Sequence, residues 1–167
     1  MNIQEIIIYD PYEVISENLK DSDEAWQDFG FKISKMPMSL RNILFDASTI
    51  EFFMELSDKY RLTSNQSRSL SEIVGKILLS DIFIGDIVDV VISKLGIDQN
   101  IATDISSKII TELFAPAIED IKKIQREKFP NRISSQNPPA RPVISPRQNT
   151  ALHSDINENN IVDLRNK

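Results

Sequence analysis

The sequence predicts an all-α protein, with a compact bundle of about four amphipathic helices over residues 39–128 and a disordered C-terminal tail. Apolar residues recur at helical spacing through the middle of the chain. Neither an alternating strand pattern nor an Asn-Gly or Asp-Gly hairpin signal lies between these stripes. Short connections between amphipathic helices leave their apolar stripes only one another to pack against, which favours a bundle.

The first two expected helices both begin at a capping signal. Ser48 with Glu51, and Thr63 with Gln66, each have the spacing of a capping box. After Thr63, five apolar residues follow at i, i+3, i+4, i+7 and i+8, which places them on one face of a helix. These five are Leu70, Ile73, Val74, Ile77 and Leu78.

Two more helices follow along the chain. One apolar stripe runs from Ile84 to Leu95 and ends at Gly96, the residue that best tolerates a left-handed helix cap. Asp98 is placed to cap the last helix, which extends to about Ile124. Pro116 lies inside that helix and predicts a kink or a restart near residues 114–116, because its ring clashes with the preceding turn and it offers no N–H.

Residues 1–38 form an acidic segment rich in aromatic residues, with Trp26, Phe29 and Phe31 as its candidate contact residues. Residues 1–36 alone carry three basic and eight acidic residues. Pro11 is placed to begin a short helix through Leu19. Two interpretations remain open: the segment packs as an additional helix against the bundle, or it is an arm that orders on a partner.

Residues 129–167 form the expected tail. Residues 126–167 hold five of the eight prolines, no glycine and a net charge of +3, and few apolar residues are present to offset the entropy of ordering them. Pro139, Arg141 and Pro142 form a PxxP pattern that favours polyproline II and suits an aromatic groove. Leu152 and Ile156 belong to a second candidate contact, a short helix that forms on a partner.

Composition removes several kinds of chemistry. The chain has no cysteine, and its one histidine, His153, lies in the tail, so neither a disulfide scaffold nor a His-based triad can be built. The four glycines fit no phosphate-binding loop. No catalytic residue, cofactor or metal ligand is therefore assigned, and an enzyme is not expected. Asp86 and Asp89 leave open a weak cation site, with a solvated helix face as the ordinary alternative.

Location follows from the distribution of apolar residues. The first ten residues carry Glu5 and Asp10 and only a three-residue apolar run, so a secretory signal is not expected. The most apolar region, residues 82–92, contains two aspartates and is too short to span a bilayer. We therefore expect a cytoplasmic protein that does not enter the membrane.

A family resemblance rests on short runs between Leu56 and Pro116. These are Leu56 with Tyr60-Arg61-Leu62, Gln66 with Leu70 and Ile73, Leu78-Leu79, Leu95-Gly96-Ile97, Ala102 with Ile105, and Phe114 with Pro116. Their pattern resembles an uncharacterised helical region that recurs in predicted proteins of small-genome bacteria. The chain departs from it after Leu79, where Ser80 and Phe83-Ile84 replace a small residue and prolines. The resemblance implies helices and a proline-containing tail, and no activity.

These observations favour a non-catalytic helical module that binds another protein, with a second copy of the chain as a further candidate partner. The alternative is a small nucleic-acid-binding regulator whose recognition helix begins near Thr63, with Lys59, Arg61 and Arg68 nearby. The net charge of −6 makes nucleic acid the less favoured partner.

Overall fold

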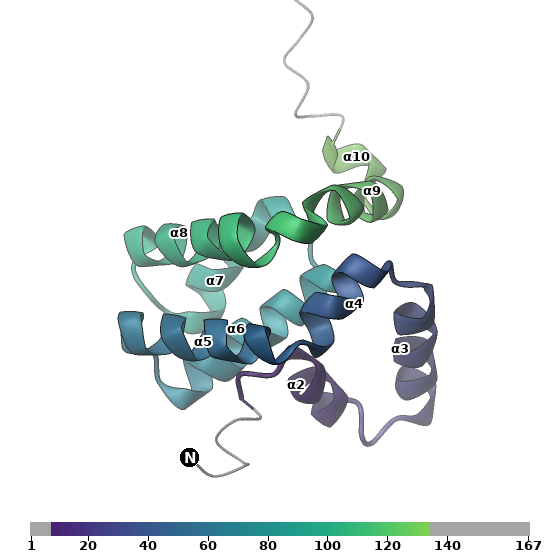
Figure 1. The fold of residues 1–167 in the computed structure, drawn as a ribbon, viewed down its shortest axis with the longest axis horizontal. Helices are drawn as coiled ribbons and strands as arrows, with labels where there is room; N and C mark the ends of the chain where they lie inside the picture. Colours follow the sequence, from purple (N-terminus) through teal and green to yellow (C-terminus); the bar gives the residue numbers. More distant parts are fainter. Residues whose placement is uncertain (1–7, 134–167) are drawn as a thin grey trace, which may run out of the picture. The chain divides into compact units, whose positions relative to one another are not determined.

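The computed structural model describes residues 8–133, and every regular element in that range is helical. The chain divides into two units, Met1–Gln136 and Asn137–Lys167, and all described residues belong to the first. Its α-helices are α2 (Pro11–Asn18), α3 (Asp23–Lys35), α4 (Met38–Phe45), α5 (Ala47–Tyr60), α6 (Ser64–Leu78), α7 (Ile87–Leu95), α8 (Gln99–Lys108), α9 (Ile118–Lys128) and α10 (Pro130–Ile133) (Figure 1).

The all-helical class is confirmed for the described residues, but the expected number of about four helices is wrong, because residues 8–133 contain nine. Two additional helices, α2 and α3, lie in the acidic N-terminal segment. A third, α4, begins after Pro37 without a side-chain cap, so its sequence carries no start signal. The expected last helix is divided into α8 and α9, and α10 lies in the segment assigned to the tail.

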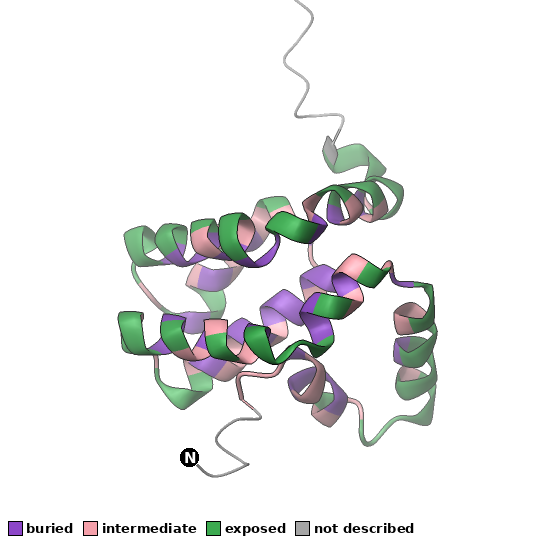
Figure 2. Cartoon of the chain, viewed as in Figure 1, coloured by how far each residue is buried: buried purple, intermediate pink, exposed green. Residues whose placement is uncertain are grey.

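Helix α6 lies at the centre of the unit and contacts α2, α4, α5 and α7 (Figure 1). Its capping box is present as predicted, with Thr63 and Gln66 bonding reciprocally. The predicted stripe from Leu70 to Leu78 is buried (Figure 2). Helix α6 therefore supplies the main apolar surface on which the other helices pack.

The start of α5 differs from the prediction by two residues. Asp46, and not Ser48, is the N-cap, and its carboxylate accepts a hydrogen bond from the Ser48 N–H at 2.8 Å. The caps predicted for the following helices are confirmed. Asp98 accepts from the Asn100 N–H, and Gly96 ends α7 in the left-handed region at φ 63°.

The path between α8 and α9 changes its hydrogen-bond pattern twice. Ile109–Leu113 form a π-helical turn, in which the Phe114 N–H reaches the Ile109 carbonyl at 2.8 Å, and Ala115–Ala117 form a 3₁₀ turn. Pro116 lies in that 3₁₀ turn, where its missing N–H removes no α-helical bond. Phe114 lies between these two turns, and its side chain is fully buried in the core.

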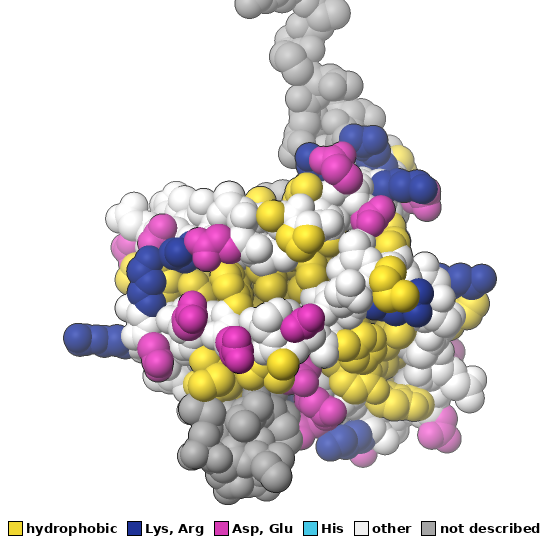
Figure 3. All heavy atoms as spheres, in the orientation of Figure 1, with side chains coloured by type: hydrophobic (Ala, Val, Ile, Leu, Met, Phe, Trp, Pro, Cys, Tyr) yellow, Lys and Arg dark blue, Asp and Glu magenta, His cyan; other side chains and the backbone are white. Residues whose placement is uncertain are grey.

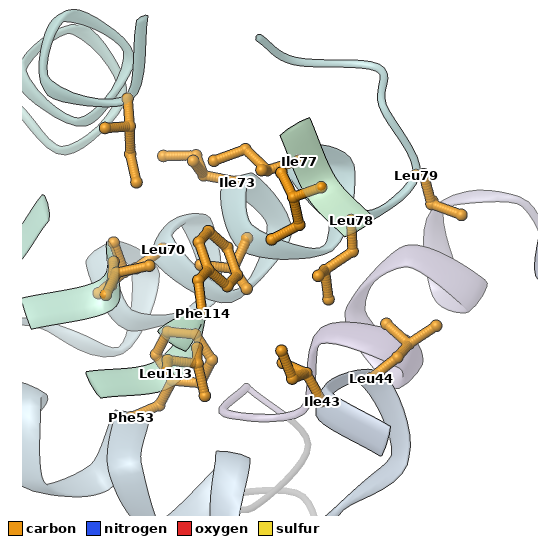
Figure 4. Packing of buried hydrophobic residues seen from close by; sticks show 14 of the residues in the cluster. Ile43, Leu44, Phe53, Leu70, Ile73, Ile77, Leu78, Leu79, Leu113 and Phe114 are labelled. Carbon is orange, nitrogen blue, oxygen red and sulfur yellow. The ribbon is translucent and has the colours of Figure 1, made fainter. Parts of the chain in front are cut away.

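One hydrophobic cluster joins the helices. Buried side chains of α4, α5, α6 and the π-helical turn converge on it (Figure 4). Helix α2 approaches α6 closely enough that a Cβ added to Gly75 would lie 2.3 Å from the Ile15 Cδ1 atom. Glycine at position 75 is what allows this approach.

Residues Phe129 and Pro130–Ile133, which composition assigns to the tail, continue the described fold. The Phe129 ring packs edge-on against Phe83, with centroids 5.6 Å apart. Arg132 lies over the Phe83 ring and forms an ion pair with Asp86. These contacts hold the end of α9 and α10 against the loop that follows α6.

None of the helices within residues 8–133 combines the length and the apolar character that crossing a membrane requires.

Candidate functional site

Four aromatic rings from three helices form one continuous row. Trp26 and Phe29 of α3 lie with ring centroids 5.7 Å apart, Phe29 stacks on Tyr12 of α2 at 5.7 Å, and Tyr12 meets Phe45 of α4 at 4.9 Å. These spacings are those of favourable aromatic pairs. We call Trp26, Phe29, Tyr12 and Phe45 the aromatic row.

Local sequence signals position each helix of the row. Asp10 caps α2 by accepting from the Tyr12 and Glu13 N–H groups at 2.9 and 3.2 Å, and Pro11 occupies the first turn. Ser22 caps α3 by accepting from the Ala25 N–H. Each cap lies about one turn or less from a residue of the row. The caps set where α2 and α3 begin, and so determine which side of its helix carries Tyr12 or Trp26.

The row is buried in its middle and exposed at both ends. Phe29 is 4% exposed, whereas Trp26 is 46% and Phe45 54% exposed. Hydrophobic side chains gather on the surface where α2, α3 and α4 meet (Figure 3). A row with a fixed centre and free ends presents preorganised apolar area, which lowers the entropy cost of binding.

Helix α4 extends this surface beyond the row. Met38, Arg41 and Phe45 follow at i, i+3 and i+7 and line one shallow hollow, with Met38 63% exposed. The Arg41 Nε atom is buried and has no hydrogen-bond partner among the described residues. Aromatic residues, Met and Arg are the types enriched in protein interfaces.

The segment that carries α2 and the start of α3 is acidic. Residues 10–24 carry six carboxylates and one lysine, a net charge of −5. Within the described part of the chain, Glu13, Asp23 and Glu24 form no ion pair, whereas Glu17 bonds Arg68 at 2.7 Å. The hydrogen bond from Arg68 is the main cause that lowers the pKa of Glu17.

Helix α3 is held mainly through this row. Phe29 is its only buried residue among those the structure describes, and Figure 2 shows most of the helix exposed. Lys32 adds a polar tie by bonding Asp81 at 3.0 Å as well as Asp28. Partial burial acts to lower the pKa of Lys32, but hydrogen bonds to both carboxylates outweigh it and raise that pKa.

Phe31 faces a different hollow. Its ring is 63% exposed and carries the Lys35 ammonium 5.6 Å from its centroid. The hollow has a volume of about 420 Å³ and lies between α3, the end of α6 and α9, with Leu78, Leu79 and Ile124 in its lining. Three lysines and two carboxylates line the same hollow, so its charge indicates no single kind of ligand.

A third hollow lies between α4, the first turns of α5 and the π-helical and 3₁₀ turns after α8. It has a volume of about 510 Å³, and Figure 3 shows hydrophobic side chains along its floor. Outside its lining, polar contacts join α5 to α8: Asp104 of α8 accepts from the Tyr60 hydroxyl and pairs with Lys59, both on α5.

The helix proposed to read nucleic acid is mostly covered. Eight of the fifteen residues of α6 are buried, and Arg68 is engaged by Glu17 and Asn18 of α2. Lys59 pairs with Asp104, and Arg61 is exposed at the end of α5 in the left-handed region at φ 51°. A recognition helix must present one full face to a groove, whereas the residues of α6 after Asn65 are all buried or only partly exposed.

Asp86 and Asp89, the two carboxylates considered as cation ligands, do not form a common site in the structure. Asp86 lies in a 3₁₀ turn and pairs with Arg132, and Asp89 is exposed on α7. Residues 8–133 contain no group of three or more acidic or histidine side chains arranged around a common metal position. Charged side chains in this range are all at least partly exposed.

The structure brings together part of the predicted contact set. Trp26 and Phe29 belong to the aromatic row, and Phe31 faces the α3/α9 hollow. Pro139, Arg141, Pro142, Leu152 and Ile156 lie outside the described residues. Sequence reasoning missed Phe45, Met38 and the role of Tyr12. Met38 and Phe45 are seven residues apart on one helix. That spacing can be read from the sequence and places both on one face, but it does not tell whether the face is buried or exposed.

No family model matches the chain, and no curated protein or solved structure is significantly similar to it. The resemblance to a helical region of small-genome bacteria therefore stays a prediction. What the site does has to follow from its own geometry and charge.

Proposed function

We propose that this protein is a non-catalytic helical interaction module that binds another protein through the aromatic row and the adjoining Met38. The observation that carries the proposal is a row of four rings whose two ends are about half exposed, while of its inner rings Phe29 is buried and Tyr12 partly buried. Large exposed aromatic residues fixed in place are typical of the energetic centre of a protein interface. The setting we propose is the cytoplasm.

Three further features support an interaction role over a catalytic one. Each lowered or raised pKa among the described groups arises at an exposed or partly exposed ion pair, or at a helix cap. No carboxylate in residues 8–133 is buried where its pKa would move toward neutrality. The exposed apolar area, by contrast, costs free energy in water unless a partner covers it.

Affinity capture with the full chain tests the proposal. The protein would be compared with a Trp26→Ser/Phe45→Ser variant and with an Ile101→Ser control. Ile101 is an exposed apolar residue of α8, 38% exposed, away from the row. All three substituted side chains are at least one-third exposed, so the fold should persist, which circular dichroism would check.

We expect a protein captured by the wild type to be retained by the Ile101 control and lost with the double variant. Identical capture by all three proteins would overturn the proposal. Salt-sensitive retardation of mixed DNA would instead favour the nucleic-acid alternative with the helix near Thr63.

A further inference from the structure

We infer that the partner segment covering the aromatic row is a basic amphipathic helix, with apolar anchors on one face and Lys or Arg along its edges. This inference rests on the proposed function and adds the chemistry of the partner. The recognising features are the exposed ends of the row, on α3 and α4, and three carboxylates of α2 and α3.

The carboxylates stand next to the row along the chain. Asp23 precedes Trp26 by one helical turn, and Glu13 follows Tyr12 directly. Glu24 is exposed in the same first turn of α3. None of the three has an ion-pair partner within the described range, so their charge is available to an approaching cation. Complementary charge steers association and sets specificity.

The aromatic row itself favours cations. Trp26 and Phe45 are each about half exposed, and aromatic rings attract the cations of Lys and Arg, with Trp the most favourable ring for that contact. Apolar anchors of the partner would fill the space next to Met38 and Phe45. An amphipathic helix supplies both contacts at i, i+3, i+4 and i+7 spacing.

A second copy of the chain is a poorer occupant of this surface. Two such faces brought together would oppose the same carboxylates, and the chain as a whole carries a net charge of −6. Like charges facing each other across an interface destabilise it. The charge pattern therefore points away from self-association through the row.

The chain contains a single tryptophan, Trp26, which makes the row its own fluorescence probe. The full chain would be titrated with a helical peptide built of Leu and Lys, and separately with its counterpart in which Glu replaces Lys. A Glu13→Gln/Asp23→Asn/Glu24→Gln variant removes three charges beside the row. The matched control, Glu51→Gln/Glu55→Gln/Asp58→Asn, removes three exposed charges from α5.

We expect the basic peptide to shift Trp26 emission to shorter wavelength and to bind at least about tenfold tighter than the acidic peptide at low salt. The variant beside the row should lose about tenfold in affinity, and the α5 control should lose less than about threefold. Equal binding of both peptides, or equal losses in both variants, would overturn the inference. A dimer in sedimentation that Phe45→Ser abolishes would also overturn it, in favour of a second copy.

The two proposals fail in different ways. If neither peptide binds, yet cellular capture is still lost with the Trp26→Ser/Phe45→Ser variant, the interaction surface stands and the basic-helix partner is wrong. If the peptide binds as expected but capture is unaffected by that variant, the surface selects basic helices without serving as the docking site in the cell.

Discussion

Phe29 and Gly75 are the two residues that hold the N-terminal helices in place. Phe29 is the buried centre of the aromatic row and the only buried residue of α3 in the described part of the chain. Gly75 lets α2 approach α6, where Ile15 and the Pro11 carbonyl lie within 3.3 Å of a Cβ at that position. Tyr12 lies on α2, the helix that packs on Gly75, and its ring stacks on Phe29 of α3. It therefore links the packing of α2 on α6 to the packing of α3 on α2.

Gly75→Ala should destabilise the protein. The new methyl group would displace Ile15 and press on the backbone of α2, an overpacking cost of about 1–3 kcal/mol that the better helix propensity of Ala only partly offsets. We expect a net loss near 1 kcal/mol in urea unfolding. Gly30→Ala is the control, because nothing lies within 4 Å of its added Cβ. That variant should gain about 0.5–1 kcal/mol, and a stabilised Gly75 variant would show that α2 does not pack closely on α6.

At the scale of elements, one buried amide joins α9 to the loop between α6 and α7. Gln125 of α9 is 1% exposed, accepts from the Ile84 N–H at 2.9 Å and donates to the Ile82 carbonyl at 3.0 Å. This side chain satisfies two backbone groups of the loop between α6 and α7. It therefore anchors that loop to α9.

Gln125→Leu should cost about 2–4 kcal/mol, because it keeps the side-chain volume but leaves two backbone groups without partners, at about 1–3 kcal/mol each. Urea unfolding measures the loss, and hydrogen exchange should show faster exchange of the Ile84 amide. Lys123→Ala, an exposed neighbour on the same helix, should change stability by less than about 0.5 kcal/mol. An unchanged Ile84 exchange rate would contradict the anchoring role.

The helices with the strongest periodicity could be predicted, and those held by tertiary contacts could not. The capping box at Thr63 and the stripe from Leu70 to Leu78 determine α6 from local sequence alone. Helix α4 depends on packing, since its N-cap is Pro37 and no side chain caps it. Of the site, Trp26 and Phe29 were identifiable as aromatic residues in an acidic segment. The aromatic row itself could not be predicted, because Phe45 of α4 meets Tyr12 of α2 only when the helices pack together.

At the scale of the whole molecule, three carboxylates with lowered pKa values make the stability of the fold depend on pH. Arg68 lowers the pKa of Glu17 chiefly by a hydrogen bond, Lys122 does the same for Glu119, and the Ser48 N–H lowers the pKa of Asp46. A carboxyl whose pKa is lower in the folded state stabilises it above the unfolded value, near 4. That contribution is lost as pH falls through the folded value.

The urea midpoint should therefore fall as pH is lowered from about 5 to about 3. Arg68→Gln should show a smaller fall, because Glu17 then titrates nearer its ordinary value, and NMR titration should show its pKa rising. Lys94→Gln serves as the control: it removes an exposed cation that forms no ion pair within residues 8–133. If Arg68→Gln and Lys94→Gln show the same pH dependence, the Arg68–Glu17 pair contributes nothing.

The most direct test of the account places a photoreactive phenylalanine analogue at position 45 of the full chain, in cells that express it naturally, and a matched one at position 101. Both positions are exposed, but only position 45 belongs to the aromatic row. If the aromatic row is a docking surface, a cross-link to a second protein of defined mass should form at position 45 and none at position 101. The absence of any product at position 45, or the same product at both positions, would contradict it.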